Sequence, residues 1–248
     1  MIYDEDYQTW DAYKHDESKR WVFNKLEVAL RQGLSAGPAG TAPESDGDYV
    51  VRPIYNIYGM GISASKVTYN KDQFEQYINH NVVKPGHFWC EWLEGPHRSV
   101  DYVLKDGRWV VSSVLIGNHY DENNLTKFHY WTKVSTQLGT PIGRLPLVLP
   151  LDDLTALNIE FRSKNIIEVH FRLGNDPFDD LPVGSVITPI WNGEEPLDGQ
   201  EYRSNLHEDM ELYSASGNLS DVRRGYSILR PSANQSAWPL GFEEWGCP

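Results

Sequence analysis

The stretch LTALNIEFRSKNIIEVHFRLG, residues 154–174, decides the fold that the sequence predicts. Apolar and polar residues alternate over 157–162 and again over 166–172, and polar residues typical of a turn lie between them. A period of two is the spacing of a strand with one buried face. The stretch therefore predicts two short antiparallel strands that form a hairpin.

The charged residues of this hairpin fall together. In the second strand, alternation places Glu168, His170 and Arg172 on one face, and pairing brings Glu160 across from them. The opposite face is apolar and contains Ile167, Val169 and Phe171. Burying two carboxylates, an imidazole and a guanidinium for structure alone is costly, so the row indicates a bound cation beside an anion. A half-buried hairpin with a charged solvent face would show the same alternation.

Composition limits the classes of function. The chain has 248 residues, 40% of them hydrophobic, which is enough for one large domain or two small ones. A net charge of −13 argues against a general affinity for nucleic acid or anionic membranes. The acidic N-terminus and the lack of a long apolar run predict neither a signal peptide nor a membrane span, so we expect a cytoplasmic protein.

A second region has the features of a phosphate site. A helix is predicted from Arg20 to Gln32, and a strand over 49–54 leads into a turn that contains Gly59 and Gly61. Backbone N–H groups of such a turn can surround phosphate oxygens, and Arg52 would add a positive charge. A plain hairpin turn would use the same residues.

The other elements are predicted by local patterns. They are a short helix at 72–78, a segment at 87–95 that leads to strands at 99–104 and 109–114, a strand within 118–133, the end of a helix at 151–156 and a strand at 183–191. His80, His87, Cys90 and His97 are too irregularly spaced for a zinc site. Near the C-terminus, Arg223 and Arg224 would bind a carboxylate or phosphate, or form surface ion pairs.

Four segments resemble, in order, motifs of the ATP-grasp enzymes. IIEVHFR at 166–172 resembles the closing metal motif, normally hydrophobic-Glu-hydrophobic-Asn-Pro-Arg, and Glu160 lies in a segment like the acidic strand before it. In that family two acids and the Asn hold magnesium on the ATP phosphates. The resemblance implies that Glu160, Glu168 and His170 bind Mg²⁺ or Mn²⁺. His170 replaces the Asn, although Mg²⁺ prefers oxygen ligands.

Two further segments resemble the family's phosphate-binding lysines. FNKLEVALRQG at 23–33 resembles the early lysine segment, with Lys25 as the candidate. VVRP at 50–53 resembles the Val-Val-Lys-Pro strand before the flexible glycine loop, here with Gly59 and Gly61. Arg52 replaces that lysine, and it keeps the charge while offering two donors on a larger side chain.

The fourth segment resembles the family's hinge. CEWLEG at 90–95 resembles Gln-Glu-Phe-Ile-Glu-Gly, and a Ser-Val-Asp strand follows at 99–101. By this resemblance the nucleotide would contact four hinge residues and one strand residue: Glu91, Trp92 and Leu93 at adenine, Glu94 at ribose, and Asp101 in the site interior. Trp92 is equally consistent with an ordinary core position.

The resemblance covers about residues 21–175 and implies an α+β fold of ATP-grasp type. Two sheet-containing subdomains, built from antiparallel sheets with flanking helices, would clasp the nucleotide. The expected division is an N-terminal extension at 1–20, the first subdomain at 21–95, the second at 96–190 and a C-terminal extension at 191–248. Family members usually begin with a further α/β domain, so we expect the C-terminal residues, a partner chain or a second copy to complete the site.

The activity that the resemblance implies is ATP-dependent ligation of a small carboxylate to an amine or another nucleophile through an acylphosphate. Lys25 and Arg52 would offset phosphate charge, and Arg172 would stabilise the developing charge. One alternative is a related nucleotide-binding or interaction protein that has lost ligation, and a second is a kinase. A third is a β-rich structural protein without enzymatic activity.

Overall fold

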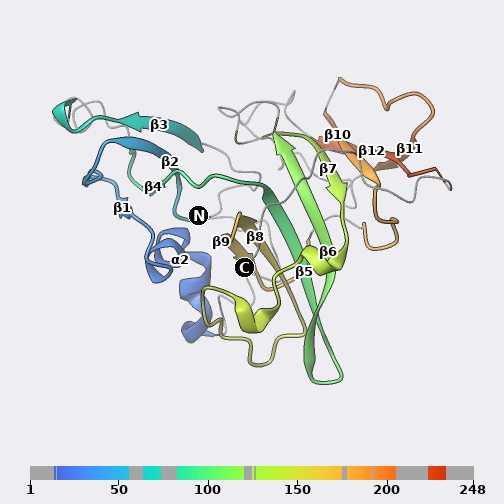
Figure 1. The fold of residues 1–248 in the computed structure, drawn as a ribbon, viewed down its shortest axis with the longest axis horizontal. Coiled ribbons are helices and arrows are strands. Elements are labelled where there is room, and N and C mark those ends of the chain that lie inside the picture. Colours follow the sequence, from blue (N-terminus) through green and yellow to red (C-terminus); the bar gives the residue numbers. More distant parts are fainter. Residues whose placement is uncertain are drawn as a thin grey trace.

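The computed structural model describes residues 14, 16–55, 64–73, 83–119, 125, 127–174, 178–191, 193–204 and 223–232. Two antiparallel sheets and a few short helices make up this part of the chain (Figure 1). The expected α+β fold with antiparallel sheets is confirmed.

The first sheet has four strands in the order β1-β4-β2-β3. Its strands are β1 (Ala36–Pro38), β2 (Gly47–Pro53), β3 (Ser65–Tyr69) and β4 (His87–Glu91). Tyr49 and Val51 of β2 pack with Trp89 of β4 in a small core on one face. The predicted strand at 49–54 is therefore present and begins two residues earlier than expected.

The second sheet has eight strands in the order β11-β12-β10-β7-β6-β5-β8-β9. Its strands are β5 (His97–Lys105), β6 (Arg108–His119), β7 (Phe128–Lys133), β8 (Ala156–Arg162), β9 (Asn165–His170), β10 (Val186–Trp191), β11 (Glu201–Ser204) and β12 (Arg223–Leu229). The strands predicted at 99–104, 109–114 and 183–191 all lie in this sheet. So do β11 and β12, from the segment expected to form a C-terminal extension.

The helix predicted over 20–32 is two helices. A 3₁₀ helix (η1) covers Glu17–Phe23, and the α-helix α2 covers Lys25–Arg31. Asn24 separates them, because its backbone is extended and its side chain accepts a hydrogen bond from the Glu27 N–H at 3.0 Å. An asparagine in this position is an N-cap, so it begins a new helix instead of continuing the earlier one.

The predicted hairpin is confirmed, with a bulge that the alternation did not reveal. β8 and β9 pair around a turn at Ser163, and Glu160 lies opposite Glu168 while Phe161 lies opposite Ile166. Ile167 is thus the extra residue of a bulge, and Ile166 occupies the buried apolar position. The assignment of Ile167 to the apolar face was wrong for this reason.

Two other expectations near the hairpin need correction. β9 ends at His170, so Arg172 lies in the segment after the strand and not in its polar row. The helix end predicted at 151–156 is instead a turn before β8, and Asp153 has a left-handed backbone with φ of 65° that interrupts any helix. Of the helix predicted at 72–78, the described part is a 3₁₀ turn at Lys71–Gln73 (η2), and residues 74–82 lie outside the described residues.

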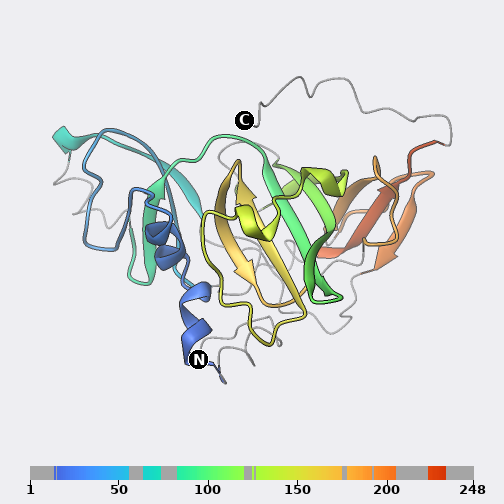
Figure 2. The ribbon, with the colours of Figure 1, turned by 60° about the horizontal axis from the view of Figure 1, so that its bottom comes forward.

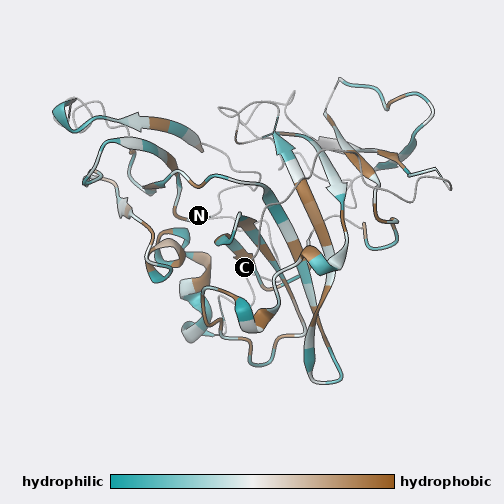
Figure 3. Ribbon diagram, viewed as in Figure 1, coloured by the Kyte–Doolittle hydropathy of each residue, from teal (hydrophilic) through white to brown (hydrophobic). Residues whose placement is uncertain are grey.

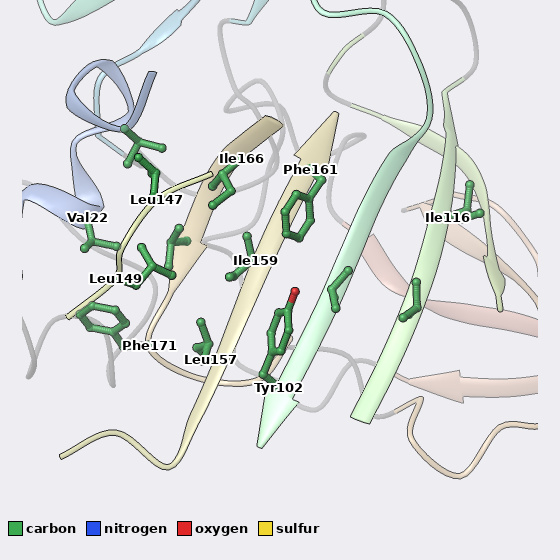
Figure 4. Close-up of a cluster of buried hydrophobic side chains, with 14 of the residues drawn as sticks. Val22, Tyr102, Ile116, Leu147, Leu149, Leu157, Ile159, Phe161, Ile166 and Phe171 are labelled. Atoms are coloured by element: carbon green, nitrogen blue, oxygen red, sulfur yellow. The ribbon is translucent and has the colours of Figure 1, made fainter. Parts of the chain in front are cut away.

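One face of the second sheet forms the main hydrophobic core (Figure 4). Tyr102, Ile159 and Phe161 project from this face. Val22 of η1 and Leu149 cover it, together with other residues of the segment between β7 and β8 that includes the 3₁₀ turns η3 (Thr136–Leu138) and η4 (Ile142–Arg144). Apolar and polar residues follow one another along the strands of this sheet (Figure 3). The opposite face of β5, β8 and β9 is left for polar side chains.

Helix α2 lies between the two sheets, as two views of the ribbon show (Figures 1 and 2). Its Val28 belongs to the core of the second sheet, while Ala29 packs against Phe88 and Cys90 of the first. At its end, the Gln32 side chain pairs with the edge of β9: its Nε2 donates to the Ile166 carbonyl at 2.8 Å, and its Oε1 accepts from the Ile166 N–H at 2.7 Å. The Gln32 amide thus makes the two hydrogen bonds to Ile166 that the backbone of a neighbouring strand would otherwise make.

The Gln32 contact can be tested by unfolding in urea. We expect Gln32→Ala to lower the free energy of unfolding by about 2 kcal/mol, because it leaves a buried N–H and C=O without their partner. Gln137→Ala, at an exposed residue of η3, is the matched control and should change it by less than about 0.5 kcal/mol. Equal effects of both changes would contradict a role of Gln32 in holding β9.

Candidate functional site

The polar face of the second sheet carries most of its buried polar side chains. They come from five adjacent strands and comprise His97, Ser113, Lys133, Asn158 and His170. Buried polar groups destabilise a fold unless they are hydrogen-bonded, and a whole row of them is uncommon in a purely structural sheet. This face is therefore the first place to look for a ligand site.

Two carboxylates face each other at the centre of the row. Glu160 of β8 is the cross-strand partner of Glu168 of β9. His97 Nε2 donates to Glu160 Oε2 at 3.0 Å, and His170 Nε2 lies 3.1 Å from Glu168 Oε1. Burial acts to raise the pKa of Glu160, but the hydrogen bond and charge of His97, with help from His170, hold it below its usual value. The carboxylate form of Glu160 is thus favoured.

Positive charge reaches this pair from the other sheet and from α2. Lys25 is 6% exposed, and its Nζ lies 3.1 Å from Glu168 Oε2. Arg52 of β2 donates from Nη2 to the Ile167 carbonyl at 3.0 Å, and its guanidinium lies over the Phe88 ring. Burial lowers the pKa of Arg52, and the charges of Glu168 and Glu160 oppose that shift. The structure brings together these five predicted residues: Lys25, Arg52, Glu160, Glu168 and His170.

Asp101 lies on the same face, farther along the sheet. It pairs across the strands with Asn158, two residues before Glu160. Its Oδ1 accepts from Asn158 Nδ2 at 2.8 Å and from the Gly174 N–H at 2.7 Å. The expected position of Asp101 in the interior is consistent with this geometry, while a contact with nucleotide stays a prediction.

The hinge residues lie where the chain passes from the first sheet to the second. Glu91 ends β4, and its Oε1 accepts from the Ser35 N–H at 2.7 Å, so its side chain is held within the first sheet. The Trp92 ring lies under Lys66 Nζ at 4.6 Å. Leu93 is half-buried and Glu94 is exposed. Contacts of these four residues with adenine and ribose stay predictions.

Three other predicted residues are not placed in the cluster. Gly59 and Gly61 lie outside the described residues. Arg172 follows β9, and its Nη1 donates to the Leu173 carbonyl at 2.6 Å. A role of Arg172 toward substrate stays a prediction.

His97 and Asn158 also lie on this face, although the sequence did not predict them as neighbours of the carboxylate pair. A signal for both was present, because each lies two residues from a polar residue on its own strand, Ser99 for His97 and Glu160 for Asn158. Alternation alone places them on the polar face.

Aromatic rings surround His97 on its far side. His119, Phe128 and Trp131 form a stack with centroid separations of 4.1 Å, and the His97 ring meets each of them edge-on. Gly117 makes room for the stack, since a Cβ there would lie 2.5 Å from Phe128. Rings packed in this way fix the orientation of His97 toward Glu160.

Comparison with known proteins identifies the fold. No protein-family model matches the sequence, and no curated protein matches it either. Solved structures do match. L-amino acid ligase from Bacillus licheniformis aligns over 84% of this chain and 66% of its own, with 12% identity and a TM-score of 0.50. N5-carboxyaminoimidazole synthetase from Staphylococcus aureus, in complex with ADP, aligns over 86% and 68%, with 7% identity and a TM-score of 0.53.

A third structure, N5-carboxyaminoimidazole ribonucleotide synthetase from Thermus thermophilus, aligns over the same shares with 12% identity and a TM-score of 0.53. The protein has the ATP-grasp fold. The chain spans about two thirds of the length of these three proteins. Within the described part of the chain, none of the helices is long and apolar enough to cross a membrane.

The carboxylate pair of this site suits a hard divalent cation. Paired carboxylates such as Glu160 and Glu168 are what Mg²⁺ uses when substrate phosphates supply its other ligands. Arg52 Nε is buried and has no hydrogen-bond partner among the described residues, so this chain also has an unused donor beside the pair. The described residues contain no group of three or more His, Cys, Asp or Glu placed to hold a metal by themselves.

The buried position of His119 predicts that the stability of the protein depends on pH. Burial, with the charge of His97 second, lowers the pKa of His119 to about 4. Between its unfolded pKa near 6.5 and this value, the unfolded chain binds a proton that the folded chain excludes, so stability falls as the pH falls through this window. We expect His119→Phe to reduce the loss of unfolding free energy between about pH 7 and pH 4, measured by urea titration. An identical loss in the variant would contradict this environment for His119.

Proposed function

We propose that this protein is an ATP-dependent ligase that activates a small carboxylate as an acylphosphate and transfers the acyl group to an amine. The observation that carries the proposal is the opposed pair Glu160 and Glu168, with Lys25 of α2 in contact with Glu168 and the charge of Arg52 of β2 near both carboxylates. Two carboxylates can hold a cation, and two cationic side chains can hold the anion bound to it.

In the first step, an oxygen of the substrate carboxylate would attack the γ-phosphorus of ATP, and ADP would leave with the electron pair of the broken bond. The protein's contribution is alignment and compensation of charge. Lys25 and Arg52 would bind phosphate oxygens, and the buried Arg52 Nε–H has no other acceptor among the described residues. Arg172, directly after β9, would offset charge on the transferred phosphoryl group.

Glu160 and Glu168 would hold Mg²⁺ or Mn²⁺, with His170 as a further ligand or as the partner of a bound water. The bound cation would neutralise phosphate charge. Both oxygens of Glu168 are engaged, one by Lys25 and one by His170. Binding would therefore release one of these contacts, and a released Lys25 would lie close enough to contact a phosphate.

The structural relatives support this class of reaction. One is an L-amino acid ligase, and another is a synthetase solved with ADP. These two proteins support nucleotide binding and ligation as a class of function. Because they share at most 12% identity with this chain, they do not indicate its substrates. The C-terminal residues, a partner chain or a second copy would complete the acceptor side.

A nucleotide-binding protein without ligase activity is the second candidate. The contacts of Lys25 and His170 with Glu168 favour it, because they engage both oxygens that a metal would need. An ATP-dependent kinase is distinguished by its substrates, since ADP release by a kinase needs an acceptor but no additional amine.

A screen for ADP release tests the proposed function. The protein is incubated with ATP, Mg²⁺ and the common L-amino acids in pairs, and products are identified by mass spectrometry. We expect ADP release that requires a carboxylate and an amine together. Glu168→Gln should lower the rate by about 100-fold or more, a loss typical of removing one electrostatic contact in an active site.

The control for Glu168→Gln is Glu195→Gln, which removes a carboxylate at an exposed position and should leave the rate unchanged. Full activity of Glu168→Gln would contradict the metal assignment. ATP binding without ADP release under any pairing would favour the second candidate.

Changing His170 tests its place in the metal shell. We expect His170→Asn, which restores an oxygen ligand at this position, to keep or raise the rate of ATP hydrolysis in Mg²⁺. A complete loss, in a variant whose circular dichroism matches the parent, would show that the imidazole does something an amide cannot.

A further inference from the structure

The two hydrogen bonds that fix the Asp101 carboxylate both go to the same oxygen, Oδ1. Both of its neutral donors, the Asn158 amide and the Gly174 N–H, bond to Oδ1. Oδ2 accepts no hydrogen bond from the described residues. Asn158 is itself fixed, because its Nδ2 also donates to Ser99 Oγ at 2.8 Å. The carboxylate is therefore oriented firmly while one oxygen stays available.

Charged groups around Asp101 come from two further elements. Lys133 of β7 is buried and donates from Nζ to Ser113 Oγ at 2.8 Å and to the Phe178 carbonyl at 3.1 Å. Burial raises the pKa of Asp101, and the charge of Asp179 adds to this, while its two hydrogen bonds and the charge of Lys133 oppose the shift. A carboxylate with a raised pKa is a stronger base than an exposed one, and the charge of Lys133 favours its ionised form.

The space beside the carboxylate depends on a glycine. A Cβ built at Gly174 would lie 3.4 Å from Asp101 Oδ1 and 3.6 Å from Oδ2. These are ordinary contact distances, and the backbone of Gly174 is not in the left-handed region, so alanine would fit without strain. A methyl group there would nevertheless occupy the space next to both oxygens.

Asp101 also lies at a useful distance from the opposed carboxylates. Ser99 pairs with Glu160, and Asp101 pairs with Asn158, so Asp101 is two residues farther along the same face. Two residues of a strand span about 7 Å. A phosphate and an acyl carbon can bridge that span between a cation at Glu160 and a nucleophile at Asp101.

We propose that Asp101 binds the amine of the second substrate through Oδ2 and is the base that removes its proton during acyl transfer. This inference rests on the proposed ligase function. Oδ2 takes one proton from the ammonium group of the second substrate and passes it to solvent. The neutral nitrogen then attacks the acyl carbon, the C–N bond forms, and the C–O bond to phosphate breaks as phosphate leaves with the electron pair and takes up the second proton of the nitrogen. Lys133 acts as a positioning residue that keeps Asp101 ionised.

Asp101→Asn separates this role from a structural one, because asparagine retains an acceptor for Gly174 and Asn158 but has no basic oxygen. Two nucleophiles are compared with ATP, Mg²⁺ and the L-amino acids as carboxylate donors. Hydroxylamine, uncharged at neutral pH, needs no base and forms a hydroxamate, whereas the α-amine of a second amino acid needs one. We expect Asp101→Asn to keep hydroxamate formation within about threefold of the parent and to lower amine ligation by about 100-fold or more.

The pH profile provides the second readout. Amine ligation by the parent should fall on the acid side of its profile as Asp101 is protonated, and this limb should be missing from the residual activity of Asp101→Asn. Gly174→Ala should raise the KM for the amine roughly tenfold or more while hydroxamate formation stays unchanged, because the added methyl group blocks the amine position. Asp152→Asn, at an exposed turn residue, is the matched control and should behave as the parent in every assay.

The outcomes separate the two proposals. Hydroxamate formation by the parent together with unimpaired amine ligation by Asp101→Asn would overturn the role of Asp101 and leave the ligase function standing. Equal losses of both products, with a lowered melting temperature, would show that Asp101 only holds Gly174 in place. No hydroxamate and no ADP from the parent would overturn both.

Discussion

Two carboxylates that face each other across adjacent strands are the constraint on which this structure depends. Like charges in directly opposed positions destabilise a sheet, and burial increases the cost. Glu160 and Glu168 are tolerated because His97, His170 and Lys25 each lie within 3.1 Å of one of their oxygens. The side chains that compensate the pair come from β5, β9 and α2, so the pair fixes how these three elements meet.

Helix α2 contacts both sheets and the carboxylate pair. It contributes Val28 to the core of the second sheet and Ala29 to a core of the first, and Lys25 to the carboxylate pair. Removing one partner of a buried ion pair lowers the free energy of unfolding by far more than the intact pair adds to it, because the remaining charge is left buried without water to solvate it. The junction of the two sheets is thus held partly by the groups that would bind a metal and phosphates, and a ligand bound there would change the contacts between α2 and the second sheet.

The sequence predicted the hairpin, its polar face and several strands because alternation follows directly from strand geometry. It did not reveal the bulge at Ile167, since one extra residue leaves no local signature, nor the break at Asn24, which an uninterrupted apolar pattern concealed. Alternation along β5 was enough to place His97 on the polar face, but its contact with Glu160 depends on pairing between β5 and β8, which are distant in the sequence. Contacts of that kind come from tertiary structure, and no single segment encodes them.

The central claim is that Glu160 and Glu168 together hold a divalent cation on a triphosphate. Electron paramagnetic resonance of Mn²⁺, titrated into the protein with a non-hydrolysable ATP analogue, measures this directly. The account predicts one tightly bound Mn²⁺ per chain, binding weaker by about tenfold or more in both Glu160→Gln and Glu168→Gln, and unchanged binding in Glu195→Gln. Equal Mn²⁺ affinity in the parent and in both site variants would contradict it.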